Sequence, residues 1–375
     1  MTALPRLLVV SRYGHEASTR PEAEIYLALR RRGYAITIAT DVESVYTRRF
    51  RESGIHVLLA HPEQRRDEGS IAALRAELLR QPYDVLVLYN SRAIANGVRA
   101  AKGIEGLTVV AYRGYAGDLR WYDPVNYLKI YHPRVDAILC NNRGVQAHIQ
   151  ANRWWARRDI THVVTKGHDL DWYEQVDPID QTTLGVPAGA AMLVCVANAA
   201  KFKGVPYLLQ AMQLLPEDPN IHLVLCGRNM DVARHRQLAE ESPYPERIHF
   251  PGYREDVFRI VRAATLKVLP SITGESLTKA VFEAMAIGTP VLITDIPGNE
   301  ELVEHGVSGW KVPARNPAAL AEAILHLVGD ASFRENLAQG AKKRLEGVLS
   351  HQATVEAMDA FFQGLSTGKE VGETN

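Results

Sequence analysis

The sequence predicts an α/β protein with two doubly wound domains, each built from a parallel sheet with helices on both faces. Three observations lead to this expectation. The chain has 375 residues, which is enough for two domains of ordinary size. Short apolar runs alternate with helical patterns, as in successive βαβ units. Apolar residues make up 46% of the sequence and charged residues 23%, which favours an ordered globular chain.

The N-terminal half supplies the strands of the first predicted sheet. These strands are Leu7 to Val10, Ala35 to Thr40, His56 to Ala60, Val85 to Tyr89, Thr108 to Tyr112 and Ala137 to Cys140. A helix from Pro21 to Arg32 is expected between the first two strands, because proline favours a helix start and Gly33 a helix end.

A strand, loop, helix and strand around residue 280 form one βαβ unit that predicts an anion site. The strands are Leu266 to Leu269 and Val291 to Thr294. The helix is expected to start near Leu277 with Ser276 as its N-cap, and to end at Gly288. Unpaired N–H groups and the helix dipole at such an N-terminus favour a phosphate.

Two carboxylates in this unit indicate what kind of phosphate compound would bind. Glu275 precedes the expected helix and Glu283 follows eight positions later, about 12 Å along a helix axis. That span suits a sugar at one end and a ribose at the other. Glu275 could instead serve only as a partner of the helix dipole. Glu283 lies among apolar residues and needs a partner, because burying an unpaired acid is costly.

The segment from Glu275 to Glu283, followed by AMAIGTPV, resembles the E-x7-E segment of retaining glycosyltransferases of family 4, which have the GT-B fold. In that family the first acid faces the donor sugar and the second holds the ribose hydroxyls. The next stretch resembles the family's G-G-x-x-E segment, with Gly298 and Glu301 matching and Pro297 replacing the first glycine. The resemblance implies two Rossmann-like domains facing a central cleft.

The same resemblance assigns roles to residues elsewhere in the chain. Lys203 and Gly204 match a lysine and glycine that grip the donor diphosphate, while Asn198 replaces an arginine whose charge Lys201 could supply. Arg113 stands where many members have a histidine near the donor sugar. The expected site residues are Glu275, Lys203 and Arg113 for catalysis and Glu283, Asn198, Lys201, Gly204, Gly274, Ser276, Leu277, Thr278, Tyr253, Arg254 and Gly14 for binding.

The resemblance also places the domain boundary, through a match between TKGHDLDWY and the family's N-G-V-D-x-x-x-F segment. We expect residues 1–168 to form the acceptor-side domain, with a helix in residues 352–375 packing back on it. Residues 169–351 would bind the donor. The polar run from Asp177 to Gly189 predicts a linker.

The resemblance implies a retaining, metal-independent transferase that moves a sugar from a nucleotide diphosphate-sugar to a hydroxyl of a saccharide or lipid-linked acceptor. Such enzymes serve the synthesis of bacterial cell-surface polysaccharide, lipopolysaccharide or glycolipid. We expect no cofactor and no metal, because the sequence lacks a DxD-like motif and His/Cys clusters at ligand spacing. Two alternatives stay open: a nucleotide-sugar epimerase of the same fold, and an inactive binding subunit, which Asn198 and Arg113 favour.

Composition and charge bear on location and partners. Three cysteines in apolar runs predict core positions in a cytoplasmic protein, and no apolar run reaches the ~20 residues of a membrane span. The net charge is zero, yet residues 1–169 hold 25 Lys+Arg and 17 Asp+Glu. Nucleic acid is not expected, since no binding motif accompanies the basic half. This excess of positive charge in residues 1–169 predicts an anionic partner, or it reflects only a solvated surface.

The segment from His148 to Arg158 combines two tryptophans with three arginines. This pairing of aromatic and cationic residues is typical of a membrane interface, although paired tryptophans also pack in cores. We therefore hypothesise that the protein docks peripherally on the inner face of an anionic membrane, which vesicle flotation at low and high salt would test.

Overall fold

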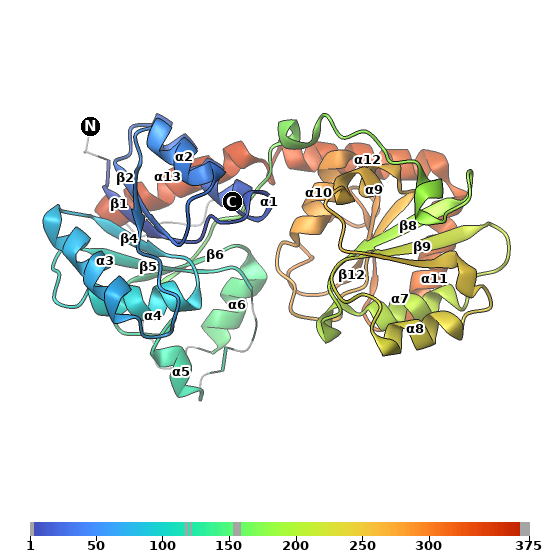
Figure 1. The fold of residues 1–375 in the computed structure, drawn as a ribbon, viewed down its shortest axis with the longest axis horizontal. Coiled ribbons are helices and arrows are strands. Elements are labelled where there is room, and N and C mark those ends of the chain that lie inside the picture. Colours follow the sequence, from blue (N-terminus) through green and yellow to red (C-terminus); the bar gives the residue numbers. More distant parts are fainter. Residues whose placement is uncertain (1–3, 116, 118, 121, 153–158, 368–375) are drawn as a thin grey trace. The chain divides into compact units, whose positions relative to one another are not determined.

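The computed structural model describes residues 4–115, 117, 119–120, 122–152 and 159–367, which form two compact units (Figure 1). Unit 1 contains the described residues up to Gly167 and those from His351 onward. Unit 2 runs from His168 to Ser350. The chain therefore changes unit between Gly167 and His168, one residue before the boundary expected from the sequence.

Unit 1 is built on a seven-stranded sheet in which every pair of neighbours is parallel, in the order β3-β2-β1-β4-β5-β6-β7. Its strands are β1 Leu7–Val10, β2 Ile36–Thr40, β3 His56–Leu59, β4 Val85–Leu88, β5 Thr108–Arg113, β6 Ala137–Cys140 and β7 Thr161–Val163. Six of these strands confirm the sequence prediction. The seventh, β7, was missed because three residues are too few to show a strand pattern.

Helices cover both faces of this sheet, which explains why its strands are continuous apolar runs (Figure 1). Leu7 and Val9 of β1 face α1, α2 and α13, whereas Leu8 and Val10 face α3, α4 and α6. The helices of unit 1 are α1 Glu16–Arg31, α2 Val45–Glu52, α3 Glu68–Arg80, α4 Ser91–Ala100, α5 Pro124–Tyr127, α6 Arg143–Ala151 and α13 His351–Thr367.

The first helix begins earlier than the sequence predicts. Helix α1 starts at Glu16, although Pro21 was expected to mark its first turn. The turn before the proline is closed by Thr19, whose N–H and hydroxyl both donate to the carbonyl of His15 at 3.1 and 2.9 Å. A proline inside a helix costs one backbone hydrogen bond, and here the helix tolerates that loss near its N-terminus.

The C-terminal helix α13 packs against α1 within unit 1. Asp359 binds Arg32 at 2.8 Å and accepts the Tyr34 hydroxyl at 2.5 Å. Phe361 and Phe362 are fully buried in the same core as strand β1. The last described helix of the chain therefore belongs to the fold of unit 1, although all strands of that unit lie between Leu7 and Val163.

Unit 2 has a second parallel sheet, of six strands in the order β10-β9-β8-β11-β12-β13. Its strands are β8 Ala191–Val196, β9 Ile221–Cys226, β10 Ile248–Gly252, β11 Leu266–Leu269, β12 Val291–Asp295 and β13 Trp310–Pro313. Its helices are α7 Val205–Met212, α8 Ala233–Glu240, α9 Val257–Ala263, α10 Lys279–Ile287, α11 Pro317–Gly329 and α12 Ala331–Glu346, with short single-turn helices η1 Leu170–Tyr173, η2 Gln181–Leu184, η3 Lys201–Lys203 and η4 Pro245–Arg247. Helices α9, α10 and α12 cover one face, and α7, α8 and α11 the other (Figure 1).

The linker predicted between Asp177 and Gly189 is wrong, because this stretch packs on unit 2. Leu184 and Val186 are buried in the core of that unit. The backbone N–H of Ile179 donates to the carbonyl of Arg259 at 3.1 Å. The polar composition of the stretch hid three apolar residues that attach it to the domain.

Three further expectations concern the cysteines, membrane-spanning helices and the aromatic and cationic segment. The three cysteines are buried free thiols, as their apolar surroundings predicted. Among the described helices, none is both long enough and apolar enough to cross a membrane. Six residues of the proposed aromatic and cationic interface, residues 153–158, lie outside the part of the chain that the structure describes.

Lys267 on β11 is fully buried, and its Nζ has no hydrogen-bond partner within the described ranges. Burial lowers the pKa of Lys267 from its ordinary value. The unfolded chain holds this proton up to about pH 10.4. Between the lowered folded pKa and that value the unfolded state binds more protons, so stability rises with pH across this window.

Replacing Lys267 with methionine is expected to raise the free energy of unfolding at pH 7 by about 1–3 kcal/mol, because an unsatisfied buried amine is removed. The rise of stability with pH should flatten in the same variant. Urea unfolding at pH 7 and pH 9 measures both effects. Lys342→Met, at an exposed position on α12, serves as the control. A destabilised Lys267→Met variant that keeps the wild-type pH dependence would contradict this account.

Candidate functional site

The candidate site of unit 2 lies where its strand order reverses. Strand β8 has β9 on one side and β11 on the other, so the loops after β8 and β11 leave the same sheet edge in opposite directions. Parallel α/β sheets bind ligands at such a switch point. The loop after β8 is residues 197–204, and the loop after β11 is residues 270–278.

A glycine brings these two loops into backbone contact. Gly204 has a φ of +66°, and a Cβ built there would lie 2.0 Å from the carbonyl oxygen of Pro270. Any other residue would clash, because the neighbouring atom belongs to the backbone. The N–H of Ile272 also donates to the carbonyl of Phe202 at 2.8 Å. The contact between the two loops therefore requires glycine at position 204, whether or not Gly204 also binds a ligand.

Lys203 and Glu275 meet at this junction. The Nζ of Lys203 lies 2.7 Å from Oε1 of Glu275, and the two side chains are only 15% and 7% exposed. Ser271 donates its hydroxyl to Oε1 at 2.5 Å, and Thr278 donates to Oε2 at 2.9 Å. The carboxylate is thus fixed by one cation from the loop after β8 and by two hydroxyls from its own loop after β11.

A third loop, after β12, closes on the same acid. Gly298 has a φ of +96°, and a Cβ there would lie 2.3 Å from the carbonyl oxygen of Glu275. Asn299 is fully buried and donates its amide to the carbonyl of Thr294 at 2.9 Å, which anchors this loop to the end of β12. The glycine that resembled the second position of G-G-x-x-E therefore allows backbone contact with the Glu275 turn.

The N-terminus of α10 differs from the prediction. The helix begins at Lys279 with Thr278 as N-cap, so Ser276 is not the cap and Leu277 lies outside the helix. The hydroxyl of Thr278 is used by Glu275, and no side chain caps the helix. The separation of about 12 Å argued from helical rise therefore does not apply, because Glu275 belongs to a loop.

This loop conformation leaves backbone donors in place for an anion. Gly274 has a φ of +72°, which permits the turn before Glu275. Among the described residues, the backbone N–H groups of Glu275 and Leu277 make no backbone hydrogen bond. Together with Lys203 they are groups that could bind a phosphate.

Glu283 lies on the second turn of α10, and its side chain is 12% exposed. The partner that an acid in this setting requires is supplied by Lys279, whose Nζ lies 2.9 Å from Oε1. Burial of Glu283 therefore does not require a ligand as its partner, because a lysine one helical turn away already serves. The expected role of Glu283 toward a ribose stays a prediction.

The remaining expected residues of unit 2 lie on turns after neighbouring strands. Asn198 and Lys201 are exposed in the loop after β8, and Asn198 accepts the N–H of Ala200 at 3.1 Å. After β10, the Tyr253 ring is exposed beneath the guanidinium of Arg228, 5.1 Å from its centroid. Arg254 is held by two hydrogen bonds to Asp256, at 2.7 and 2.8 Å.

The guanidinium of Arg254 lowers the pKa of the Asp256 carboxyl. A close backbone approach also joins two of these turns: Gly227 has a φ of +142°, and a Cβ there would lie 1.7 Å from the carbonyl oxygen of Ala197. The turns after β8 and β9 are therefore adjacent, as a site for an extended ligand across several strands requires.

Sequence reasoning missed the residues that hold the predicted ones in place. Ser271 and Asn299 position the turn of Glu275, Asp256 holds Arg254, and Lys279 pairs with Glu283. The spacing of four residues between Lys279 and Glu283 was a signal that could have found Lys279, because residues four apart are neighbours on a helix.

Arg113 and Gly14 belong to unit 1, whereas the cluster around Glu275 belongs to unit 2. Arg113 ends β5, donates its Nε to the carbonyl of Tyr115 at 2.7 Å, and stacks on the Tyr115 ring. It lines a cavity of about 850 Å³. Gly14 precedes α1 beside Val42. In the described ranges of both units, no three His, Cys, Asp or Glu side chains are arranged to hold a metal.

The family model of glycosyl transferases group 1 matches residues 178–344, which include Lys203, Glu275 and Glu283. The matched stretch is less than half of the chain and lies within unit 2, which is thus similar to this family. With its two parallel-sheet units, the chain has the GT-B fold.

Curated relatives match part of the chain. The lipopolysaccharide core biosynthesis glycosyltransferase LpsE of Rhizobium meliloti is 26% identical over 227 residues, which are 60% of this chain and 64% of the relative. The D-inositol 3-phosphate glycosyltransferase of Xylanimonas cellulosilytica is 28% identical over 239 residues, 61% of this chain and 57% of the relative. The chain thus matches less than two thirds of the length of either relative.

A solved structure matches nearly all of the chain. The crystal structure of HepE from Anabaena in complex with UDP covers 96% of this chain and 100% of its own, with a TM-score of 0.75. The two sequences are 19% identical, so this likeness is one of fold.

Proposed function

We propose that this protein is a retaining glycosyltransferase that moves a sugar from a nucleoside diphosphate-sugar to a hydroxyl of a saccharide or lipid-linked acceptor. The observation that carries the proposal is the buried pair of Lys203 and Glu275 at the switch point of unit 2. These residues are 72 positions apart, and their side chains meet at 2.7 Å between loops that could bind a diphosphate.

Each group at the junction has a role in this reaction. The ammonium of Lys203 has three N–H donors, so it can contact a phosphate while it keeps its bond to Glu275. The N–H groups of Glu275 and Leu277 add fixed donors toward the same negative charge. Glu283 would accept the ribose hydroxyls, and Tyr253 and Arg254 would lie beside the base.

The chemistry follows from where the charge develops. The bond between the anomeric carbon and the donor phosphate oxygen breaks, and a bond from that carbon to the acceptor oxygen forms on the same face. The proton of the acceptor hydroxyl passes to the departing phosphate oxygen. Lys203 and the loop amides would stabilise the negative charge that builds up on the leaving diphosphate.

The relatives support this proposal. The stretch that matches the family model of glycosyl transferases group 1 covers the proposed donor site. LpsE is named for lipopolysaccharide core biosynthesis, and HepE was solved with UDP. These names favour a nucleotide-sugar donor and a role in cell-surface polysaccharide or lipopolysaccharide synthesis. The basic excess of residues 1–169 further supports our proposal that the reaction occurs at the cytoplasmic face of an anionic membrane, which flotation would test.

Incubation with radiolabelled UDP-, GDP- and ADP-sugars and a membrane extract tests the proposed function. We expect label to move from one donor to an acceptor in the extract, with the anomeric configuration of the donor retained in the product. Conversion of the donor to another nucleotide-sugar without an acceptor would instead indicate an epimerase. Binding of a donor that stays unchanged would indicate an inactive binding subunit, and either outcome would overturn the proposal.

A further inference from the structure

Unit 1 contains a cavity at its own topological switch point. Strand β1 has β2 on one side and β4 on the other, so ligands of this sheet are expected beyond the ends of β1 and β4. The cavity occupies this place, has a volume of about 850 Å³, and is lined by Arg12 after β1 and by Tyr89 and Asn90 after β4. Its size is that of a site for a small molecule.

The charged groups that line the cavity are mostly cations: Arg12, Arg65, Arg92, Arg113 and Lys129, with Asp123 as the one carboxylate among its described lining residues. Arg12 is paired with Asp41 at 2.7 Å. Asp123 caps α5 by accepting the N–H of Val125 at 2.9 Å. No ion pair within the described ranges involves Arg65, Arg92 or Lys129.

These cations act on one another. Burial lowers the pKa of Lys129, and the nearby charge of Arg65 lowers it further; Asp123 raises this pKa, and Arg113 lowers it. Like charges gathered in one concave site raise the free energy of the unliganded protein. An anion bound among them would remove this repulsion and gain charge-assisted hydrogen bonds.

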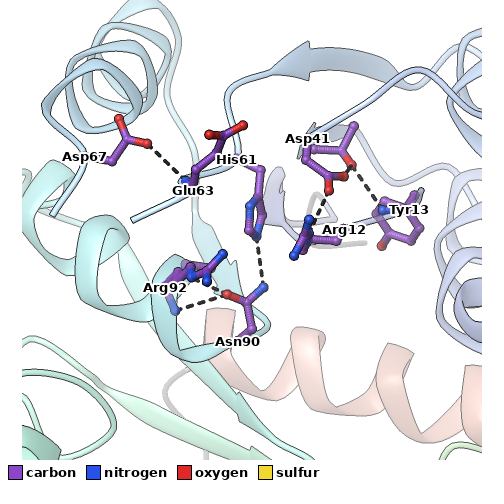
Figure 2. A network of polar contacts seen from close by, with 10 residues as sticks. Arg12, Tyr13, Asp41, His61, Glu63, Asp67, Asn90 and Arg92 are labelled. Carbon is purple, nitrogen blue, oxygen red and sulfur yellow. Dashed lines mark hydrogen bonds and ion pairs between the residues drawn. The ribbon is translucent and has the colours of Figure 1, made fainter. Parts of the chain in front are cut away.

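A hydrogen-bonded network joins lining residues of the cavity (Figure 2). Asn90 accepts the N–H groups of Arg92 and Ala93 through Oδ1, at 3.1 and 3.0 Å, which turns its Nδ2 toward His61. The Nε2 of His61 lies 2.9 Å from that amide and accepts its hydrogen. Burial lowers the pKa of His61 to about 4, so the ring is neutral at pH 7. The network positions the start of α4, which carries Arg92.

We propose that this cavity binds an oxyanion group of the acceptor, a phosphate ester or a carboxylate, with Arg65, Arg92 and Lys129 as its cationic contacts. The assignment to the acceptor rests on the proposed function, in which unit 2 holds the donor. The three cations come from three separate segments of the chain. All three line the same cavity, so a single ligand bound there could contact them together. The acceptor would therefore be an acidic or phosphorylated saccharide rather than a neutral one.

Calorimetric titration of the full chain with glucose, glucose 6-phosphate and glucuronate tests this inference. We expect at least one of the two anionic sugars to bind about tenfold more tightly than glucose, and the preference to weaken as salt is added. The stronger of the two identifies the group as phosphate or carboxylate. Equal affinity for all three sugars, or binding of none, would overturn the inference.

Variants separate a specific site from general attraction to a basic protein. Arg65→Gln combined with Lys129→Gln should reduce the affinity for the anionic sugar about tenfold or more and leave the affinity for glucose unchanged. Arg31→Gln, at an exposed position in the last turn of α1, should change neither affinity. An unchanged affinity in the double variant, with a folded protein shown by an unchanged Tm, would contradict the proposal.

The same titration with nucleoside diphosphates keeps the two proposals distinct. If the anionic sugar binds but UDP, GDP and ADP do not, the proposed donor site is wrong and the oxyanion site stands. If a nucleoside diphosphate binds and no anionic sugar is preferred, the donor site stands and the oxyanion site is wrong.

Discussion

Replacing Lys203 with alanine is expected to lower the rate of sugar transfer about 100-fold or more. The ammonium would face the diphosphate that leaves with negative charge, and removal of one such donor typically costs a factor of about 100 to 1,000. The loss should appear mainly in contacts with the diphosphate. Affinity for the nucleoside should therefore fall much less than affinity for the nucleoside diphosphate, which calorimetry of both ligands measures.

Stability must be separated from chemistry in this variant, because Lys203 also pairs with the buried carboxylate of Glu275. Breaking a buried ion pair costs about 3–5 kcal/mol. The cost here should be smaller, since Ser271 and Thr278 still donate to the carboxylate. The pair Lys203→Met and Glu275→Gln, made together, should recover stability without recovering transfer.

Lys343→Ala, on the exposed side of α12, is the control for Lys203→Ala and should leave transfer unchanged. Equal losses of affinity for the nucleoside and the nucleoside diphosphate in Lys203→Ala would indicate a folding defect instead of a lost phosphate contact. Recovery of both transfer and stability in the double variant would show that Lys203 has no role in the reaction.

The second large effect is expected from Glu283→Ala, which should weaken nucleoside diphosphate binding about 10- to 100-fold. Hydrogen bonds to a charged group contribute about 1.5–3 kcal/mol each, and the ribose would lose the carboxylate that accepts from its hydroxyls. The unfolding free energy should change by less than about 1 kcal/mol. This change should be small because the lost ion pair with Lys279 is an i,i+4 pair on a helix, which contributes little to stability, and because alanine has the highest helix propensity.

Lys279→Ala is the matched control for Glu283→Ala. It removes the same ion pair but leaves the carboxylate in place, so nucleotide affinity should stay close to that of the wild-type protein. Equal weakening in both variants would mean that the ion pair, and not the carboxylate, supports the site. A Glu283→Ala variant that binds nucleoside diphosphate as tightly as the wild-type protein would rule out the ribose role.

The fold could be predicted because buried parallel strands are apolar on both faces. Strands such as β1 and β4 are unbroken apolar runs between polar loops, and this pattern does not depend on distant contacts. Helix boundaries were harder. Ser276 was a plausible cap by residue type, but the hydrogen bonds of Thr278 and the contact of Gly298 place the Glu275 turn outside the helix. Those contacts join two separate loops, the one after β11 and the one after β12.

The candidate site was predictable only in part. Resemblance to known transferases pointed to Lys203 and Glu275, and the structure brings these two together. The resemblance did not point to Ser271 or Asp256, whose contribution is to hold another side chain in position. The unit 1 cavity could not be predicted for a further reason: Arg65, Arg92 and Lys129 line one cavity only because the sheet order places their segments at one edge.

Calorimetric titration of the wild-type chain with UDP, GDP and ADP tests the central claim, that unit 2 binds a nucleoside diphosphate at the junction of Lys203 and Glu275. We expect one of the three to bind with a saturable isotherm and to raise the Tm, because a ligand of the native state stabilises it. The corresponding nucleoside should bind more weakly. Absence of binding by all three nucleotides to the folded protein would contradict the account.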